Sequence, residues 1–262
     1  MTANPNPPSD NSKQVSLQQI AQQFMVGLQQ HFDMLAYSLA SRHSVREEDY
    51  VRYAKAPLIM PVASRHQNFE QMQAYAGDLM LRQVIGDILN LSVTALNNAH
   101  FLLALVKATH AKNEVSKDSQ EIAQRSQKKF ISAQLDEKFN LLEQDYGVLC
   151  EMEDSITSLS FCMHALVKQG GQVRSAQLDS NGELVVEYKA VRLSGGVDAV
   201  EAVKPKQSLN AKLSEQRKVF RQGDFIAFSD TELQLILVSV AAFADSLFQS
   251  VDSYAKNYKS PN

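Results

Sequence analysis

Residues 81–107, LRQVIGDILNLSVTALNNAHFLLALVK, set the architecture of this chain. Apolar and small side chains recur there every three or four positions, which is the period of one helix face. The face consists of Leu81, Ile85, Ile88, Ser92, Ala95, Ala99, Leu103 and Val106. Because no proline occurs between residues 68 and 111, the pattern predicts one long helix, or two stacked helices, at the centre of the fold. Polar residues such as Asp87 and Asn98 interrupt every run of about 18 residues, so a buried helix is predicted rather than a membrane span.

Helices are also predicted on the N-terminal side of this stretch. Residues 1–14 are polar and contain three prolines, so we expect a disordered tail there. Ser16 and Gln19 have the spacing of a capping box, and an amphipathic pattern continues from them to about Ala40. A short charged helix is expected to follow from Ser44.

The C-terminal half repeats the helical pattern. From Phe130 the apolar periodicity resumes and predicts a helix that ends at Gly170-Gly171, where glycine can adopt the left-handed cap. The outer face of this helix is acidic over residues 136–154. A second capping box at Ser229 begins the last helix.

Between these helices the period changes to that of a strand. Residues 172–193 are rich in β-forming residues on both sides of Asn181-Gly182, which predicts an antiparallel hairpin that turns at this dipeptide. A further helix is expected at about 209–220. The predicted fold is therefore mainly α: a single domain over residues 15–262, built as a bundle of long antiparallel helices with one inserted β-hairpin.

Composition restricts the class of protein. The chain has 262 residues, of which 26 are basic and 29 acidic, for a formal net charge of −3. This balance excludes a protein that is basic throughout and binds nucleic acid by overall charge. The first residues have neither the basic start nor the apolar core of a signal peptide, and only two cysteines are present. We therefore expect a cytoplasmic protein that does not bind a membrane.

The sequence offers no metal or cofactor site. Cys150 and Cys162 are expected on one helix, about 18 Å apart along its axis, which is too far to share a zinc ion. The sequence also lacks a Gly-x-Ser-x-Gly nucleophile motif and a phosphate-binding glycine loop. We expect no metal and no small-molecule cofactor.

One segment is strongly basic. Between Lys204 and Arg221 there are six basic residues and one acidic residue. The candidate binding residues of this basic strip are Lys212, Arg217, Lys218 and Arg221. The strip could bind phosphates or an acidic partner. Alternatively it pairs with the acidic residues 136–154 of the same chain, and this second interpretation is the one we favour.

Residues 163–171, MHALVKQGG, resemble the signature motif of the HEPN superfamily, which consists of small helical bundles, many of them dimeric ribonucleases. The family motif is an arginine, a polar residue, a few further residues and then a histidine. Met163 stands at the position of the arginine, His164 at the polar position and Lys168 at that of the histidine. Downstream, residues 222–233 resemble the family's entry into its last helix.

The resemblance implies the HEPN fold but not the activity of the family. In the family, the arginine and histidine promote attack of the RNA 2′-hydroxyl on the neighbouring phosphate. Such chemistry needs a group that exchanges protons near neutral pH, and an ordinary lysine amine remains protonated there. We therefore assign no catalytic residue in the degenerate motif.

The expected function is that of a non-catalytic HEPN-like interaction protein. The resemblance implies a homodimer that binds a protein partner or RNA in a toxin–antitoxin, CRISPR-associated or antiviral defence system. Two alternatives stay open: a metal-independent ribonuclease with a variant active site, in which His164 and Lys168 act, and an unrelated all-α adaptor protein.

Overall fold

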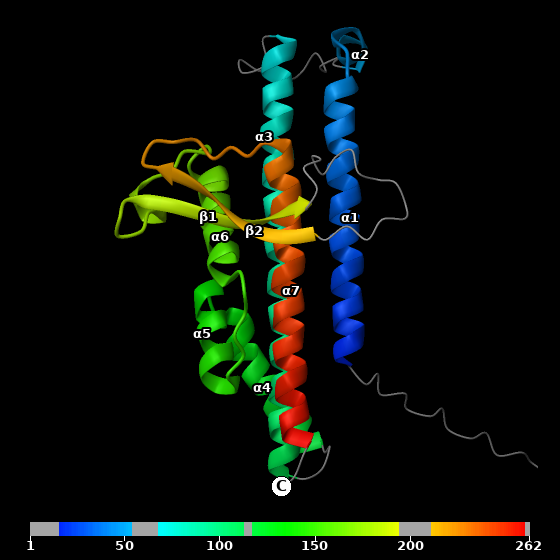
Figure 1. The fold of residues 1–262 in the computed structure, drawn as a ribbon, viewed down its shortest axis with the longest axis vertical. Coiled ribbons are helices and arrows are strands. Elements are labelled where there is room, and N and C mark those ends of the chain that lie inside the picture. The colour runs from blue at the N-terminus through cyan, green and yellow to red at the C-terminus, as the bar shows by residue number, and fades with distance from the viewer. Residues whose placement is uncertain (1–15, 54–67, 113–116, 194–210, 260–262) are drawn as a thin grey trace, which may run out of the picture.

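Three long helices run along the molecule and form its frame (Figure 1). The computed structural model describes residues 16–53, 68–112, 117–193 and 211–259. The frame helices are α1 (Leu17–Ser44), α3 (Phe69–Lys112) and α7 (Asp230–Lys259). They pack against one another, and α1 runs in the opposite direction to α3 and α7. The protein is mainly α with one inserted β-hairpin, as the sequence predicts.

The N-terminal helix begins where its capping box predicts. The Gln19 N–H donates to Ser16 Oγ at 3.2 Å, and the Ser16 N–H donates to the Gln19 side chain at 3.4 Å. The apolar face then buries Phe24, Leu28 and Leu35 against the neighbouring helices. The short charged helix follows as α2 (Glu47–Tyr53).

The central helix is one continuous helix rather than two stacked ones. Ile85, Ile88, Leu96, Ala99 and Leu103 are completely buried in α3, which packs against α1, α4, α6 and α7. By length and composition alone, α3 and α7 each contain a window apolar enough to cross a membrane. In each window 44% of the residues are buried inside the bundle, and core helices of soluble proteins pass the same test.

The single helix expected from Phe130 to Gly170 is wrong, because the chain forms three helices in this region. These are α4 (Lys117–Ser132), α5 (Leu135–Tyr146) and α6 (Glu153–Lys168). Lys138 ends α4 by donating to the carbonyls of its last turn, and Gly147 ends α5 with a φ of 64°. Cys150 therefore lies in the α5–α6 connection and not on the helix of Cys162. The end of α6 at Gly170-Gly171 is as predicted.

The hairpin exists, but its second strand is not the predicted one. β1 (Glu183–Leu193) pairs antiparallel with β2 (Ala211–Arg221), so the helix expected at 209–220 is wrong. Residues 172–178, expected as a strand, contain the short 3₁₀ helix η1 (Ser175–Gln177). Asp179 explains the difference, because its carboxylate accepts the N–H groups of Asn181 and Glu183. The resulting turn leads into β1 and does not reverse a strand upon itself.

The hairpin is fixed to the bundle by hydrogen bonds between β1 and the helices α6 and α7. The Lys189 N–H donates to Ser239 Oγ of α7 at 2.7 Å, and Ser155 Oγ of α6 donates to the Glu187 carbonyl. The predicted capping box of α7 is formed, since the Glu232 N–H donates to Ser229 Oγ at 3.2 Å and the Ser229 N–H donates to the Glu232 carboxylate at 2.7 Å.

Candidate functional site

The degenerate motif lies at the C-terminal end of α6 and divides between two faces of that helix. Met163 is half-buried and its terminal methyl lies against Gly86 of α3. His164 is exposed, and the buried Gln177 side chain donates to its Nδ1 at 3.0 Å. Lys168, one turn further along α6, is also exposed. The structure thus places His164 and Lys168 on one surface, with Met163 turned toward the core.

The basic strip forms β2, and the alternation of the strand divides its residues between two faces. By register, Lys218 lies on one face, whereas Arg217 and Arg221 share the other, and Lys212 pairs with Arg192 in the ladder. Lys218 Nζ lies 2.6 Å from the Glu232 carboxylate, and Arg221 lies 3.4 Å from that of Glu183.

The expected pairing of the basic strip with residues 136–154 is therefore wrong for Lys218 and Arg221. Their partners are Glu232 on α7 and Glu183 on β1, because a strand in this position faces α7 and its own neighbour. Burial by itself would raise the pKa of Glu232. The hydrogen bonds and charge of Lys218 and the Ser229 N–H outweigh it and hold this pKa below its ordinary value. The charge of Lys218 thus stabilises the start of α7.

The two cysteines do not form a reactive or metal-binding site. Burial raises the pKa of both Cys150 and Cys162 to about 12, so neither thiol ionises near neutral pH. Within the described ranges, no group of three or more His, Cys, Asp or Glu side chains is placed to hold a metal ion.

A buried polar cluster joins α3, α4 and α5. His100 stacks on the Phe130 ring at 4.1 Å, and its Nδ1 lies 2.6 Å from the Gln127 side-chain oxygen. Lys138 is 3% exposed and donates to the carbonyls of Phe130 and Ile131 at the end of α4. Burial lowers the pKa of both His100 and Lys138. This cluster closes a helix junction and has a structural role.

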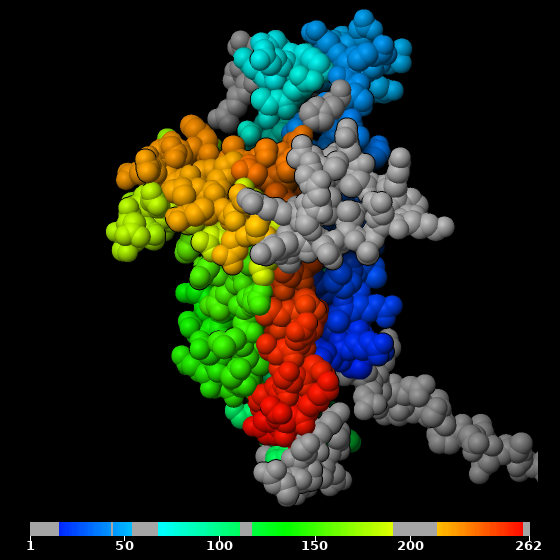
Figure 2. Space-filling model, in the orientation of Figure 1, coloured from blue at the N-terminus to red at the C-terminus, as the bar shows by residue number. Residues whose placement is uncertain are grey.

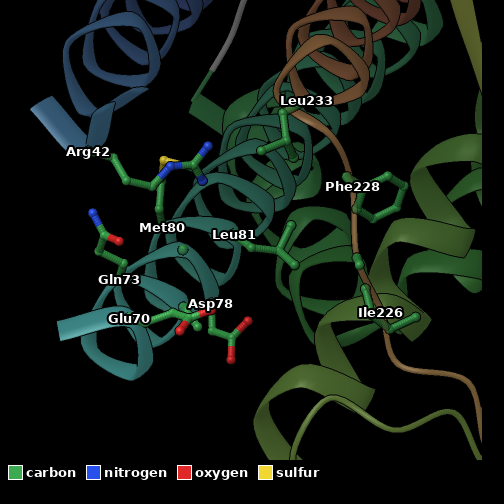
Figure 3. A pocket seen from close by; sticks show the side chains of 12 residues that line it. Arg42, Glu70, Gln73, Asp78, Met80, Leu81, Ile226, Phe228 and Leu233 are labelled. Atoms are coloured by element: carbon green, nitrogen blue, oxygen red, sulfur yellow. The ribbon is translucent and has the colours of Figure 1, made fainter. Parts of the chain in front are cut away.

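At one end of the bundle, α1, α2 and α3 extend past the hairpin (Figure 2). Residues of this end line two adjoining hollows. We call them together the end cleft; they share Arg42, Gln73 and Met80. The first has a volume of about 520 Å³ and lies between α3 and the segment before α7 (Figure 3). The second, of about 390 Å³, lies between α1, α2 and α3.

The lining of the end cleft is mostly apolar, with charge at its rim. Its carbon-rich side chains are Tyr37, Val45, Tyr50, Phe69, Met72, Met80, Leu81, Ile226, Phe228 and Leu233. Glu70 and Asp78 project from α3 and are exposed (Figure 3). The Arg42 guanidinium reaches across from α1 and forms an ion pair of 2.6 Å with Asp230 at the start of α7.

The sequence-based search for sites missed the end cleft. One signal was available: Phe69, Met72, Ala76 and Met80 extend the apolar stripe of α3 by three turns before Leu81. Because α7 begins only at Asp230, among the described residues no third long helix packs beside this extension of α3. The position of α7 along α3 depends on tertiary packing, and no local pattern in the sequence indicates it.

Comparison with protein-family models, with curated proteins and with solved structures gave no significant match to this chain. The resemblance to HEPN proteins therefore stays a prediction that rests on residues 163–171 and 222–233.

Proposed function

We propose that this protein is a non-catalytic interaction protein and that its end cleft holds a segment of another protein. One observation carries the proposal: Tyr37, Tyr50, Phe69 and Met72 line a hollow at the end of the helical bundle, and among the described residues this hollow is open to solvent. Tyr37 is 70% exposed, so this aromatic side chain is available to a partner. Apolar grooves between helices commonly bind an apolar face of a partner helix or peptide.

The charges at the rim indicate the chemistry of the bound segment. Glu70 and Asp78 are exposed beside the first hollow, whereas the positive charge of Arg42 is compensated by Asp230. The rim is therefore acidic toward a ligand. An apolar segment that also carries lysine or arginine would complement it.

RNA is the less favoured ligand. Lys218 and Arg221 of the basic strip are paired with carboxylates, and Arg217 stands opposite Glu187 in the β1–β2 register. A surface that neutralises its own cations attracts phosphates weakly. The substitution of the family arginine and histidine by Met163 and Lys168 supports a role without catalysis. In this proposal the protein is a degenerate HEPN-like bundle, and a defence or toxin–antitoxin system is the setting that the resemblance implies.

The binding experiment uses a fluorescein-labelled amphipathic peptide with leucines on one helical face and lysines beside them. A second peptide carries glutamate in place of each lysine. We expect the basic peptide to bind the full chain more tightly than the acidic one in fluorescence anisotropy. Met72→Glu should weaken binding by at least about tenfold, because it places a carboxylate in the apolar hollow. Gln124→Glu on the exposed side of α4 is the matched control.

A charge reversal tests the rim independently. The double variant Glu70→Lys, Asp78→Lys should invert the preference, so that the acidic peptide binds better. A peptide affinity that is unchanged in both the Met72 variant and the rim variant would contradict the proposal. Tight, salt-sensitive binding of single-stranded RNA, lost on replacing Arg217, Lys218 and Arg221, would favour the RNA function instead.

A further inference from the structure

One edge of the hairpin is held by the bundle and the other is open. On β1, the Lys189 N–H donates to Ser239 and the Glu187 carbonyl accepts from Ser155, so both groups point away from β2. Glu183 behaves in the same way, since its N–H and carbonyl bond to Asp179. The odd-numbered residues of β1 thus point their backbone N–H and C=O groups away from β2.

The alternation along β1 determines which backbone N–H and C=O groups of β2 point away from β1. Residues directly opposite each other in an antiparallel pair either both bond inward or both point outward. Glu215 lies opposite Lys189, Arg217 opposite Glu187, and Val219 opposite Val185. The N–H and C=O groups of these three β2 residues therefore point to the free side of the strand. Among the described residues, no hydrogen bond outside the ladder uses them.

The free edge of β2 is also exposed. Glu215, Arg217 and Val219 are all exposed, whereas the helices pack chiefly against β1. An edge strand with several unpaired backbone groups is a template for another strand. What pairs with it depends on the side chains that would stand opposite.

We propose that the edge of β2 pairs with β2 of a second copy of this chain, antiparallel and with Gln216 opposite Gln216. In this register Glu215 stands opposite Arg217 of the second copy, and Arg217 opposite its Glu215. Leu213 stands opposite Val219 of the second copy. Both pairs occur twice because the two-fold axis passes between the two strands at Gln216.

Charge selects this register over its neighbours. An axis at Arg217 would place two arginines directly opposite each other, and an axis at Glu215 would place two glutamates there. Like charges directly opposite in a sheet are unfavourable. With the axis at Gln216, one row of the four-stranded sheet reads Lys189, Glu215, Arg217 and Glu187, with the last two from the second copy. The charges alternate across all four strands.

The surface is separate from the end cleft, so this proposal does not rest on the proposed function. Its first test is the molecular mass of the full chain by analytical ultracentrifugation over a range of concentrations. We expect a monomer–dimer equilibrium. A protein that stays monomeric at every concentration would overturn the proposal.

Charge variants test the pairing. Arg217→Glu and Glu215→Arg should each weaken the dimer by at least about tenfold, because each places like charges opposite one another. The double variant should recover most of the affinity. Lys128→Glu on α4 makes the same charge change at an exposed site and should leave the dimer intact. A dimer unaffected by either single change would show that the interface lies elsewhere.

Cross-linking tests the register without altering charge. Gln216→Cys should form a disulfide with its own copy under mild oxidation, because the two Cα atoms would lie about 4.5 Å apart. Ser214→Cys should not, since its copy would be four residues away along the strand. Cross-linking of both variants, or of Ser214→Cys alone, would rule out the register. Val219→Pro provides a backbone test, because it removes an N–H that the β1–β2 ladder does not use.

Discussion

The terminal methyl of Met163 lies 3.3 Å from the point that a Cβ on Gly86 would occupy. Two helices, α3 and α6, approach each other closely at this contact. The residue that stands where the HEPN family has its arginine is therefore part of helix packing. Arginine at this position would direct a long charged side chain toward α3 rather than toward His164.

The close contact predicts opposite effects for two substitutions at Gly86. Gly86→Ala should raise the free energy of unfolding by about 0.5 kcal/mol, because glycine in a helix interior costs roughly 0.5–1 kcal/mol and the flexible end of Met163 can move aside. Gly86→Val should lower it by about 1–2 kcal/mol through overpacking. Urea denaturation measures both. A loss of stability in the alanine variant would show that Met163 cannot adjust.

The ion pair between Lys218 and Glu232 predicts a difference within the basic strip. Lys218→Ala should lower the free energy of unfolding by about 1–2 kcal/mol, because it leaves a half-buried carboxylate that also caps α7 without its cation. Arg221→Ala should change it by no more than about 0.5 kcal/mol, since the Arg221 side chain is 75% exposed. Equal losses in the two variants would contradict this assignment.

The buried His100 predicts a pH dependence of stability. Burial lowers its pKa below the ordinary value of 6.5, although Gln127 and Asp145 oppose the shift. The unfolded chain therefore binds the proton first, so the contribution is fully present above pH 6.5 and is lost as the pH falls from that value through the lower pKa of the folded state. His100→Gln should flatten the unfolding free energy below about pH 6.5. An unchanged pH profile in His100→Gln would assign the dependence to other groups.

The accuracy of sequence-based prediction differed between helices and strands for a physical reason. The capping boxes at Ser16 and Ser229 and the stripe around Ile88 are local patterns, and all three predicted their helices. β2 was missed because Lys212–Arg221 is rich in residues that favour helix, and its strand conformation depends on pairing with β1, a distant segment.

The candidate sites, like the strands, could be predicted only where they depend on residues close together in the sequence. His164 and Lys168 lie on one face of α6, because residues four apart share a helix face. The end cleft could not be predicted, since it arises from the offset between α3 and α7. The partner of Lys218 was also beyond local reasoning, because Glu232 comes next to it only when the hairpin packs beside α7.

The degenerate motif predicts that the protein does not cleave RNA without a metal. Met163 faces α3, while His164 and Lys168 lie on an open surface and line neither hollow of the end cleft. Incubation of the full chain with mixed labelled RNA in EDTA should leave the RNA intact. Met163→Arg, Lys168→His should be equally inactive, because the new arginine would point toward the core. Cleavage by the native chain that is lost in His164→Ala or Lys168→Ala, but kept in the exposed control Val167→Ala, would establish the ribonuclease alternative.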